Sequence, residues 1–159
     1  MNTATHDVFT DCAANEIRDW TKTLVGHDNL DGTVGAVASN IAHRSTTRIF
    51  LYSDASGGAG CLRHSPDSAF ARRGARYPSV VIETSFAQKR KDLPKLAEDY
   101  ILGSRGRITL VIGLDIEYRR CKRATLSMWR PERVVDNGVP FLGVKQAVDS
   151  KVQPSLPNP

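Results

Sequence analysis

The sequence predicts a single α/β domain in which a mixed central sheet is flanked by helices. Helix-period apolar stripes occur near the start and in the middle of the chain, and short β-rich segments lie between and after them. The chain has 159 residues, of which 40% are hydrophobic and 25% charged, a balance that suits one globular core. The resulting order is helix, three strands, helix, two strands, which is expected to place helices on both faces of the sheet.

The first third of the chain has one clear helix and several weaker signals. One apolar face over residues 10–25 carries Ile17, Trp20 and Leu24 at helical spacing. A second, weaker helix is expected at residues 34–42 and a short strand at residues 48–52. Residues 53–60 are expected to be a flexible glycine-rich connection, because they match neither the phosphate-loop nor the dinucleotide-binding pattern.

The middle of the chain is expected to form two strands and the best-defined helix. The strands are predicted at residues 67–71 and 80–84, and three consecutive β-branched residues in the second are typical of a strand buried on both faces. The helix follows Asp92, an N-cap residue, has Pro94 in its first turn and ends at Gly103.

The last third is expected to form a pair of strands and a short edge strand. The long apolar run at residues 108–116 is too rich in β-branched residues for a helix, and residues 124–129 are expected to return beside it. Pro131 is expected to stop that pairing. Residues 134–138 are then predicted to be a loop and residues 139–144 a last edge strand.

We expect one domain at residues 10–145, between a disordered start at residues 1–9 and a disordered, proline-containing tail at residues 146–159. The net charge of +5 is a weak indication of a polyanionic partner. Three cysteines, far apart and odd in number, argue against a disulfide framework or a structural zinc site. With neither an apolar run long enough to span a membrane nor a secretory signal, we expect an intracellular protein of the cytoplasm or nucleus, away from membranes.

Two carboxylates on neighbouring expected strands, Asp67 and Glu83, form the candidate site. A hairpin of that length brings both side chains to one end of a sheet, where they repel each other unless a cation neutralises them. Mg²⁺ suits such a pair, since it takes one or two carboxylates and leaves its other positions to water and phosphate. The alternative is that Asp67 is an ordinary turn residue. His64, three residues earlier, is either a general base or a loop histidine, and the loop interpretation is favoured.

The order of these motifs resembles that of the PD-(D/E)xK, or restriction-endonuclease-like, superfamily. The segments that carry the likeness are Pro66-Asp67, Val80 to Ser85, the helix with Leu96 to Tyr100, and Ile108 to Asp115. A closer similarity, to fungal proteins of that superfamily, rests on Tyr77-Pro78, Ser85 to Leu93, Ala97 to Ile101, and Trp129-Arg130-Pro131. The resemblance covers roughly residues 16–131 and implies an αβββαβ core.

The resemblance implies that Asp67 and Glu83 bind a catalytic Mg²⁺ or Mn²⁺ and that the backbone carbonyl of Thr84 completes the site. The superfamily's lysine, two residues after the glutamate, is replaced here by Ser85. Relatives carry this lysine on the next helix, so the candidates are Lys89, Lys91 and, best placed, Lys95, with Gln88 as a polar substitute. The alternative is that these lysines form a solvated basic turn and a solvent-facing helix surface.

Basic residues around the expected hairpin are candidates for contacts with a phosphate backbone, namely Arg72, Arg73, Arg76, Lys89, Arg90 and Lys91. Such residues are also common in ordinary turns. The sequence and the resemblance together predict a Mg²⁺-dependent nuclease that hydrolyses phosphodiester bonds of nucleic acid, or a degenerate descendant of one. The alternative is a non-catalytic module that binds nucleic acid or protein and keeps the nuclease fold without the lysine.

Overall fold

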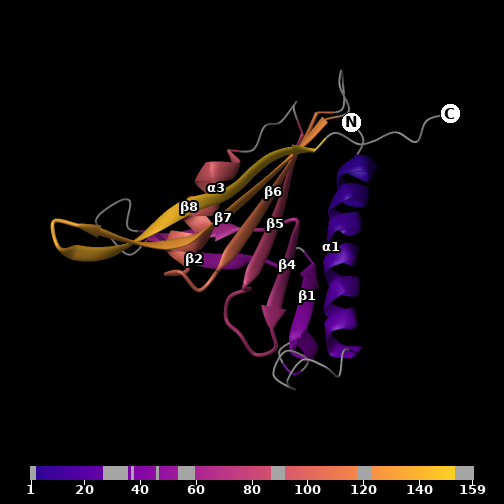
Figure 1. Cartoon of the computed structure of the whole chain (residues 1–159), viewed down its shortest axis with the longest axis horizontal. Coiled ribbons are helices and arrows are strands. Elements are labelled where there is room, and N and C mark those ends of the chain that lie inside the picture. Colours follow the sequence, from indigo (N-terminus) through magenta and orange to yellow (C-terminus); the bar gives the residue numbers. More distant parts are fainter. Residues whose placement is uncertain are drawn as a thin grey trace.

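A mixed six-stranded sheet with helices on its two faces forms the centre of the protein in a computed structural model (Figure 1). The structure describes residues 3–26, 36, 38–45, 47–53, 60–86, 92–117 and 123–152. Its elements are α1 (Thr3–Gly26), β1 (Ile41–Ser45), β2 (Ile49–Ser53), β3 (Gly60–His64), β4 (Ser68–Arg72), β5 (Val80–Phe86), α3 (Leu93–Gly103), β6 (Leu110–Glu117), β7 (Arg123–Asp136) and β8 (Val139–Val152).

The strands of the large sheet lie in the order β1-β4-β5-β6-β7-β8. Neighbouring strands are antiparallel except β5 and β6, which are parallel and are connected through α3. Strands β2 and β3 form a separate antiparallel hairpin. The predicted α/β class with a mixed sheet and flanking helices is therefore confirmed.

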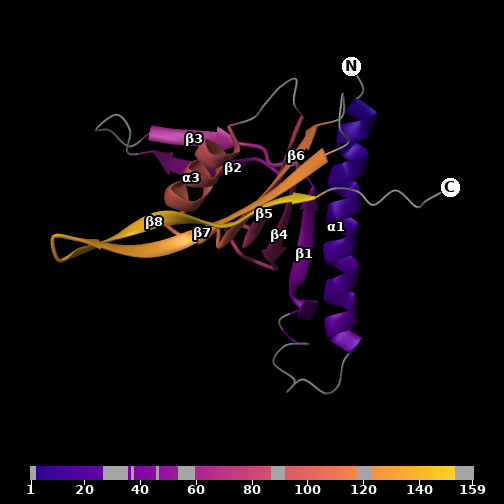
Figure 2. The same cartoon turned by 45° about the horizontal axis from the view of Figure 1, so that its top comes forward.

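The two faces of the sheet bury different halves of the core. One face, here called the α3 face, packs Ala69, Val81, Val111 and Trp129 against helix α3 and the β2–β3 hairpin. The opposite, α1 face packs Phe70, Ile82 and Ile112 against Ala14 of α1. Figure 2 shows α1 along one side of the sheet and α3 with the hairpin on the other. Neighbours in β5 alternate between the faces and are completely buried, as expected for a central strand.

Helix α3 forms as the sequence predicts. The side chain of Asp92 accepts a hydrogen bond from the Lys95 backbone N–H at 3.2 Å, and Pro94 lies in the first turn, where its missing N–H costs nothing. At its other end Gly103 approaches β2 so closely that an added Cβ would lie 2.8 Å from Leu51 Cβ and 2.9 Å from the Tyr52 carbonyl. The glycine that ends the helix thereby also lets it pack on the hairpin.

Two expectations for the first half were wrong, and one strand was not expected. Helix α1 already begins at Thr3, within the stretch expected to be disordered. Residues 41 and 42, the expected end of a second helix, belong to strand β1, which pairs with β4 at the edge of the sheet. Strand β3 follows the expected glycine-rich connection and pairs with β2. The pairing of β1 with a strand far along the chain is not revealed by local propensity.

The second half also departs from expectation, since β7 continues through Pro131 to Asp136 and β8 reaches Val152. The expected loop at residues 134–138, the short edge strand and the disordered tail from residue 146 were therefore wrong within the described residues. Pairing of β7 with β6 ends at Trp129, so Pro131 lies where no β6 neighbour needs its missing N–H. Asn137 and Gly138, with φ of 48° and 81°, make the tight turn. The β7–β8 hairpin projects from the body of the molecule (Figures 1 and 2).

No helix in the described part of the chain is long and apolar enough to cross a membrane.

Candidate functional site

The β4–β5 pairing brings the two predicted acids together. Ser68 lies opposite Ile82 in the antiparallel register, and one further step along both strands places Asp67 opposite Glu83. The Asp67 carboxylate bends toward β5, where its Oδ2 accepts a hydrogen bond from the Thr84 backbone N–H at 2.7 Å. The hairpin expected from the sequence therefore places both acids at the open end of the β4–β5 pair.

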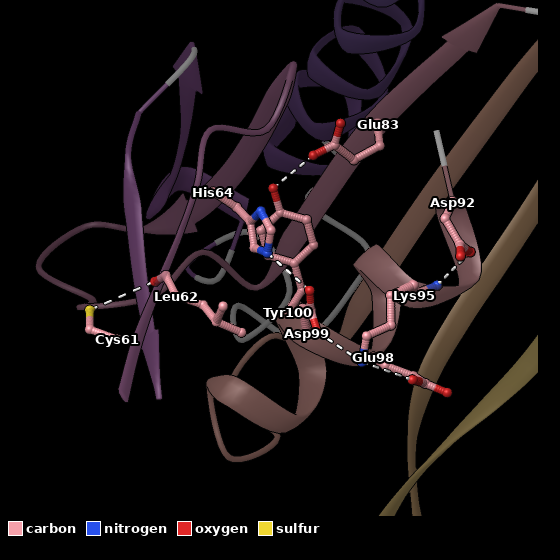
Figure 3. A network of polar contacts seen from close by, with 9 residues as sticks. All are labelled: Cys61, Leu62, His64, Glu83, Asp92, Lys95, Glu98, Asp99 and Tyr100. Carbon is pink, nitrogen blue, oxygen red and sulfur yellow. Dashed lines mark hydrogen bonds and ion pairs between the residues drawn. The ribbon is translucent and has the colours of Figure 1, made fainter. Parts of the chain in front are cut away.

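Glu83 lies on the α3 face and is only 3% exposed. The hydroxyl of Tyr100, which is completely buried on α3, donates a hydrogen bond to Glu83 Oε1 at 2.7 Å (Figure 3). Burial, and after it the negative charge of Glu83, raises the pKa of Tyr100 well above its usual range. Tyr100 therefore stays a neutral donor at physiological pH. The negative charges of Asp67 and Asp99 also raise the pKa of Tyr100, so three carboxylates act on this side chain.

Thr84 connects the two faces at this position. Its backbone N–H donates to Asp67, and in an extended strand the carbonyl of a residue faces the same edge as its N–H. Its side chain lies on the other face, where its hydroxyl is 2.9 Å from the hydroxyl of Thr10 on α1. The Thr84 carbonyl thus faces the edge of β5 that carries Asp67, and α1 holds the strand from behind.

Ser85, which occupies the position of the superfamily's lysine, is buried. Strand alternation places it on the α3 face with Glu83, and the parallel register with β6 places it beside Asp115. A short hydroxyl side chain next to another acid therefore stands where the superfamily has a lysine.

Lys95 does not replace the missing lysine in the observed arrangement. Its amine lies 3.2 Å from Asp99 Oδ1 and 3.5 Å from Glu98 Oε2, and its side chain is 62% exposed. The hydrogen bond with Asp99 raises the pKa of Lys95, so the amine stays charged and bound to carboxylates of its own helix. Figure 3 shows it directed away from Glu83. The other candidates, Gln88, Lys89, Arg90 and Lys91, lie outside the described residues.

His64, for which the sequence favoured a loop position, lies beside Tyr100 and Asp99. It is the last residue of β3, and its Nε2 lies 3.1 Å from Asp99 Oδ2. Its ring packs against the ring of Tyr100, with 5.3 Å between centroids (Figure 3). The loop interpretation was therefore wrong. His64 and Asp99 lie 35 positions apart in the chain, and no local pattern links them.

Among the described residues, no group of three or more His, Cys, Asp or Glu side chains could hold a metal ion. The candidate set is accordingly two carboxylates, Asp67 and Glu83, with the Thr84 carbonyl on the same edge. These oxygen donors fit Mg²⁺ or Mn²⁺, because Mg²⁺ is commonly held by one or two carboxylates and keeps several waters. They do not fit zinc, which prefers nitrogen and sulfur ligands in a closed tetrahedral set.

The predicted arginines do not surround the acids. Arg72 ends β4 at the turn of the hairpin, roughly 17 Å along the strand from Asp67, and the alternation of β4 directs it to the α1 face. Arg73 follows it in the exposed turn. Arg76 lies on the aromatic rings of Tyr52 and Tyr77, 5.7 and 5.4 Å from their centres. Arg72, Arg73 and Arg76 therefore lie toward the turn of the β4–β5 hairpin, whereas the rest of the expected basic rim lies outside the described residues.

Comparison of the chain with protein-family models, with curated proteins and with solved structures found no match. The likeness to the PD-(D/E)xK superfamily therefore stays a prediction that rests on the order of the motifs.

Proposed function

We propose that this domain is a divalent-metal-dependent phosphodiesterase that acts on nucleic acid. The observation that carries the proposal is the convergence of Asp67 and the buried Glu83 at the open end of the β4–β5 pair. Neighbouring carboxylates repel each other, and a cation bound between them relieves this repulsion. A divalent cation satisfies both acids and provides a binding point for a phosphate group.

The order of the elements supports a restriction-endonuclease-like core. Helix α1, strands β1, β4 and β5, helix α3 and strand β6 follow one another as αβββαβ, and the β2–β3 hairpin is inserted between β1 and β4. Asp67 directly precedes the second of these core strands, and Glu83 lies in the middle of the third. Strands β7 and β8 extend the sheet beyond this core.

Asp67, Glu83 and the Thr84 carbonyl are the groups that would hold Mg²⁺ or Mn²⁺. When bound, such an ion lowers the pKa of its water and neutralises charge that develops on the phosphoryl group. Tyr100 fixes the Glu83 carboxylate through its hydrogen bond. In the absence of a lysine at position 85, we assign the role of proton acceptor to His64, which packs beside Tyr100. When its Nε2 donates to Asp99, its Nδ1 can accept a proton from an attacking water.

The metal site is tested by thermal unfolding with and without a few millimolar Mg²⁺ or Mn²⁺. Binding to the folded state alone raises the melting temperature. Glu83→Gln should abolish this rise, whereas the control Glu98→Gln, a glutamate exposed on the outer surface of α3, should keep it. A rise that is the same in Glu83→Gln and in the wild type would refute the acid pair as the metal site.

Catalysis is tested by incubating single- and double-stranded DNA and RNA with the protein and Mn²⁺. Asp67→Ala should abolish cleavage, and His64→Gln should reduce it by about 10²–10⁴-fold, the usual contribution of a general base. Cleavage that persists unchanged in Asp67→Ala comes from another site or from a contaminant. Full activity in His64→Gln would remove the histidine from the mechanism and leave the metal site standing.

A second candidate function is non-catalytic binding of nucleic acid. Two observations favour it, namely the buried Ser85 at the lysine position and the engagement of Lys95 by Asp99 and Glu98. This alternative predicts affinity for nucleic acid in EDTA that falls steeply with salt, without cleavage in Mn²⁺. A flat dependence of affinity on salt would remove nucleic acid as a partner under either function.

A further inference from the structure

We propose that a pocket formed by Arg44, Arg48 and Arg76 binds a phosphate group of a nucleic-acid strand. The choice of a nucleic acid as ligand rests on the proposed function, whereas the choice of a phosphate rests on the pocket itself. The pocket has a volume of about 140 Å³, and its lining also includes Thr47, Ile49, Phe50, Ala69, Tyr77 and Pro78. It is smaller than the roughly 300–1,000 Å³ typical of sites for drug-sized ligands, so it suits a single compact group.

The pocket carries a concentrated positive charge. Its three arginines come from β1, from the β1–β2 connection and from the β4–β5 turn, and the fold brings them to one place. No carboxylate is among the lining residues, and within the described part of the chain none of the three guanidinium groups forms an ion pair. Three positive charges around one small pocket, without a counter-charge among the lining residues, favour the binding of an anion there.

The pocket is also held in shape before any ligand arrives. The Arg44 guanidinium donates to the Ala75 carbonyl at 3.3 Å, and Arg76 is held by its contacts with the rings of Tyr52 and Tyr77. The Tyr77 hydroxyl donates to the Phe50 carbonyl at 3.2 Å and ties the turn to β2. Arginines fixed in this way lose little freedom on binding, and their planar donors match phosphate oxygens.

The position of the pocket relative to the acids favours a polymer over a free anion. Ala69 lines the pocket on the α3 face, and Asp67 lies two residues before it in the chain, about 7 Å away along the strand direction. Ile49, another lining residue, pairs with His64. A strand with one phosphate at the acid pair can therefore place another of its phosphates among the arginines. Phe50, 54% exposed beside the pocket, offers a ring on which a base can stack.

The test uses Arg48→Gln in the full chain, because Arg48 is exposed and makes no described hydrogen bond or ion pair. Affinity for a short labelled single-stranded oligonucleotide is measured in EDTA at several salt concentrations. We expect Arg48→Gln to weaken binding several-fold and to reduce the slope of log affinity against log salt by about 0.7, the value for one phosphate contact on a single strand. The control Arg133→Gln removes the same charge from the projecting β7–β8 hairpin and should leave the slope unchanged.

Competition with inorganic phosphate distinguishes the two possible ligands of the pocket, a phosphate of a nucleic-acid strand and a free phosphate ion. If Arg48→Gln loses phosphate binding and keeps the oligonucleotide slope, the pocket takes a free anion and the nucleic-acid proposal is wrong. If both variants behave like the wild type toward both ligands, the pocket binds neither. The metal-induced rise in melting temperature and its loss in Glu83→Gln report on the acid pair alone. Failure of the proposed function and failure of the pocket therefore give different results.

Discussion

Replacing Tyr100 with phenylalanine tests how the protein tolerates a buried acid, Glu83, in the middle of β5. The substitution removes one oxygen atom and keeps the ring that packs against His64. The lost hydroxyl is the donor to Glu83 Oε1 at 2.7 Å, and both side chains are almost completely buried. Water cannot easily replace this donor, so the Glu83 carboxylate keeps its desolvation cost without its partner.

The expected loss is about 2 kcal/mol of unfolding free energy, because hydrogen bonds to charged groups contribute about 1.5–3 kcal/mol. For a chain of this size that corresponds to a decrease in melting temperature of roughly 4–8 °C. Tyr77→Phe is the matched control, since its hydroxyl donates to the neutral Phe50 carbonyl at 3.2 Å. That variant should lose only about 1 kcal/mol.

These losses of unfolding free energy are measured by urea unfolding. The proteins compared are the wild type, Tyr100→Phe, Tyr77→Phe, Glu83→Gln and the double variant that combines Tyr100→Phe with Glu83→Gln. If the pair is coupled as the structure shows, the effects of Tyr100→Phe and Glu83→Gln should not add, and the coupling energy should exceed about 1 kcal/mol. Two results would contradict a strong buried hydrogen bond between Tyr100 and Glu83. One is a Tyr100→Phe variant that is no less stable than Tyr77→Phe, and the other is additive effects of Tyr100→Phe and Glu83→Gln.

Three further predictions concern stability and the role of the lysine. The pKa of Tyr100 is raised on folding, whereas an unfolded tyrosine titrates near 10. The ionisation of Tyr100 should therefore lower the free energy of unfolding above about pH 10 by ~1.4 kcal/mol per pH unit. Urea unfolding of Tyr100→Phe at several pH values should lack this decrease. Gly103→Ala should lower the melting temperature by several degrees, since its Cβ would meet Leu51 and the Tyr52 carbonyl at under 3 Å; an unchanged value would contradict the close packing of α3 on β2. Lys95→Gln should leave the metal-induced rise in melting temperature and any cleavage unchanged; a loss of activity would show that its amine reaches the acids.

Local signals predicted the central part of the fold well. The cap at Asp92, the proline in the first turn and the glycine at position 103 define α3 without help from its neighbours. Three consecutive β-branched residues correctly indicated that β5 is buried on both faces. One available signal was missed: Asn137-Gly138 between β-prone segments is a strong indicator of a tight hairpin, and it predicts the β7–β8 turn that was taken for a loop.

The site was predictable only in part. Asp67 and Glu83 follow from their positions on adjacent strands, and the register places them opposite each other. The partners of these acids could not be found in the same way, because Tyr100 reaches Glu83 from a helix on the α3 face and His64 reaches Asp99 from the inserted hairpin. Hydrogen bonds between segments far apart in the chain have no sequence period.

The sequence by itself therefore determined the α/β class, the central strand β5, helix α3 and the pair of acids, since each depends on local propensity, capping or strand alternation. Tertiary structure alone decided the remaining features. It pairs β1 with β4 and β2 with β3, directs Lys95 to Asp99, places His64 beside Tyr100, and gathers Arg44, Arg48 and Arg76 in one pocket. These features depend on which faces pack together, and packing is settled by contacts across the whole chain rather than by neighbours along it.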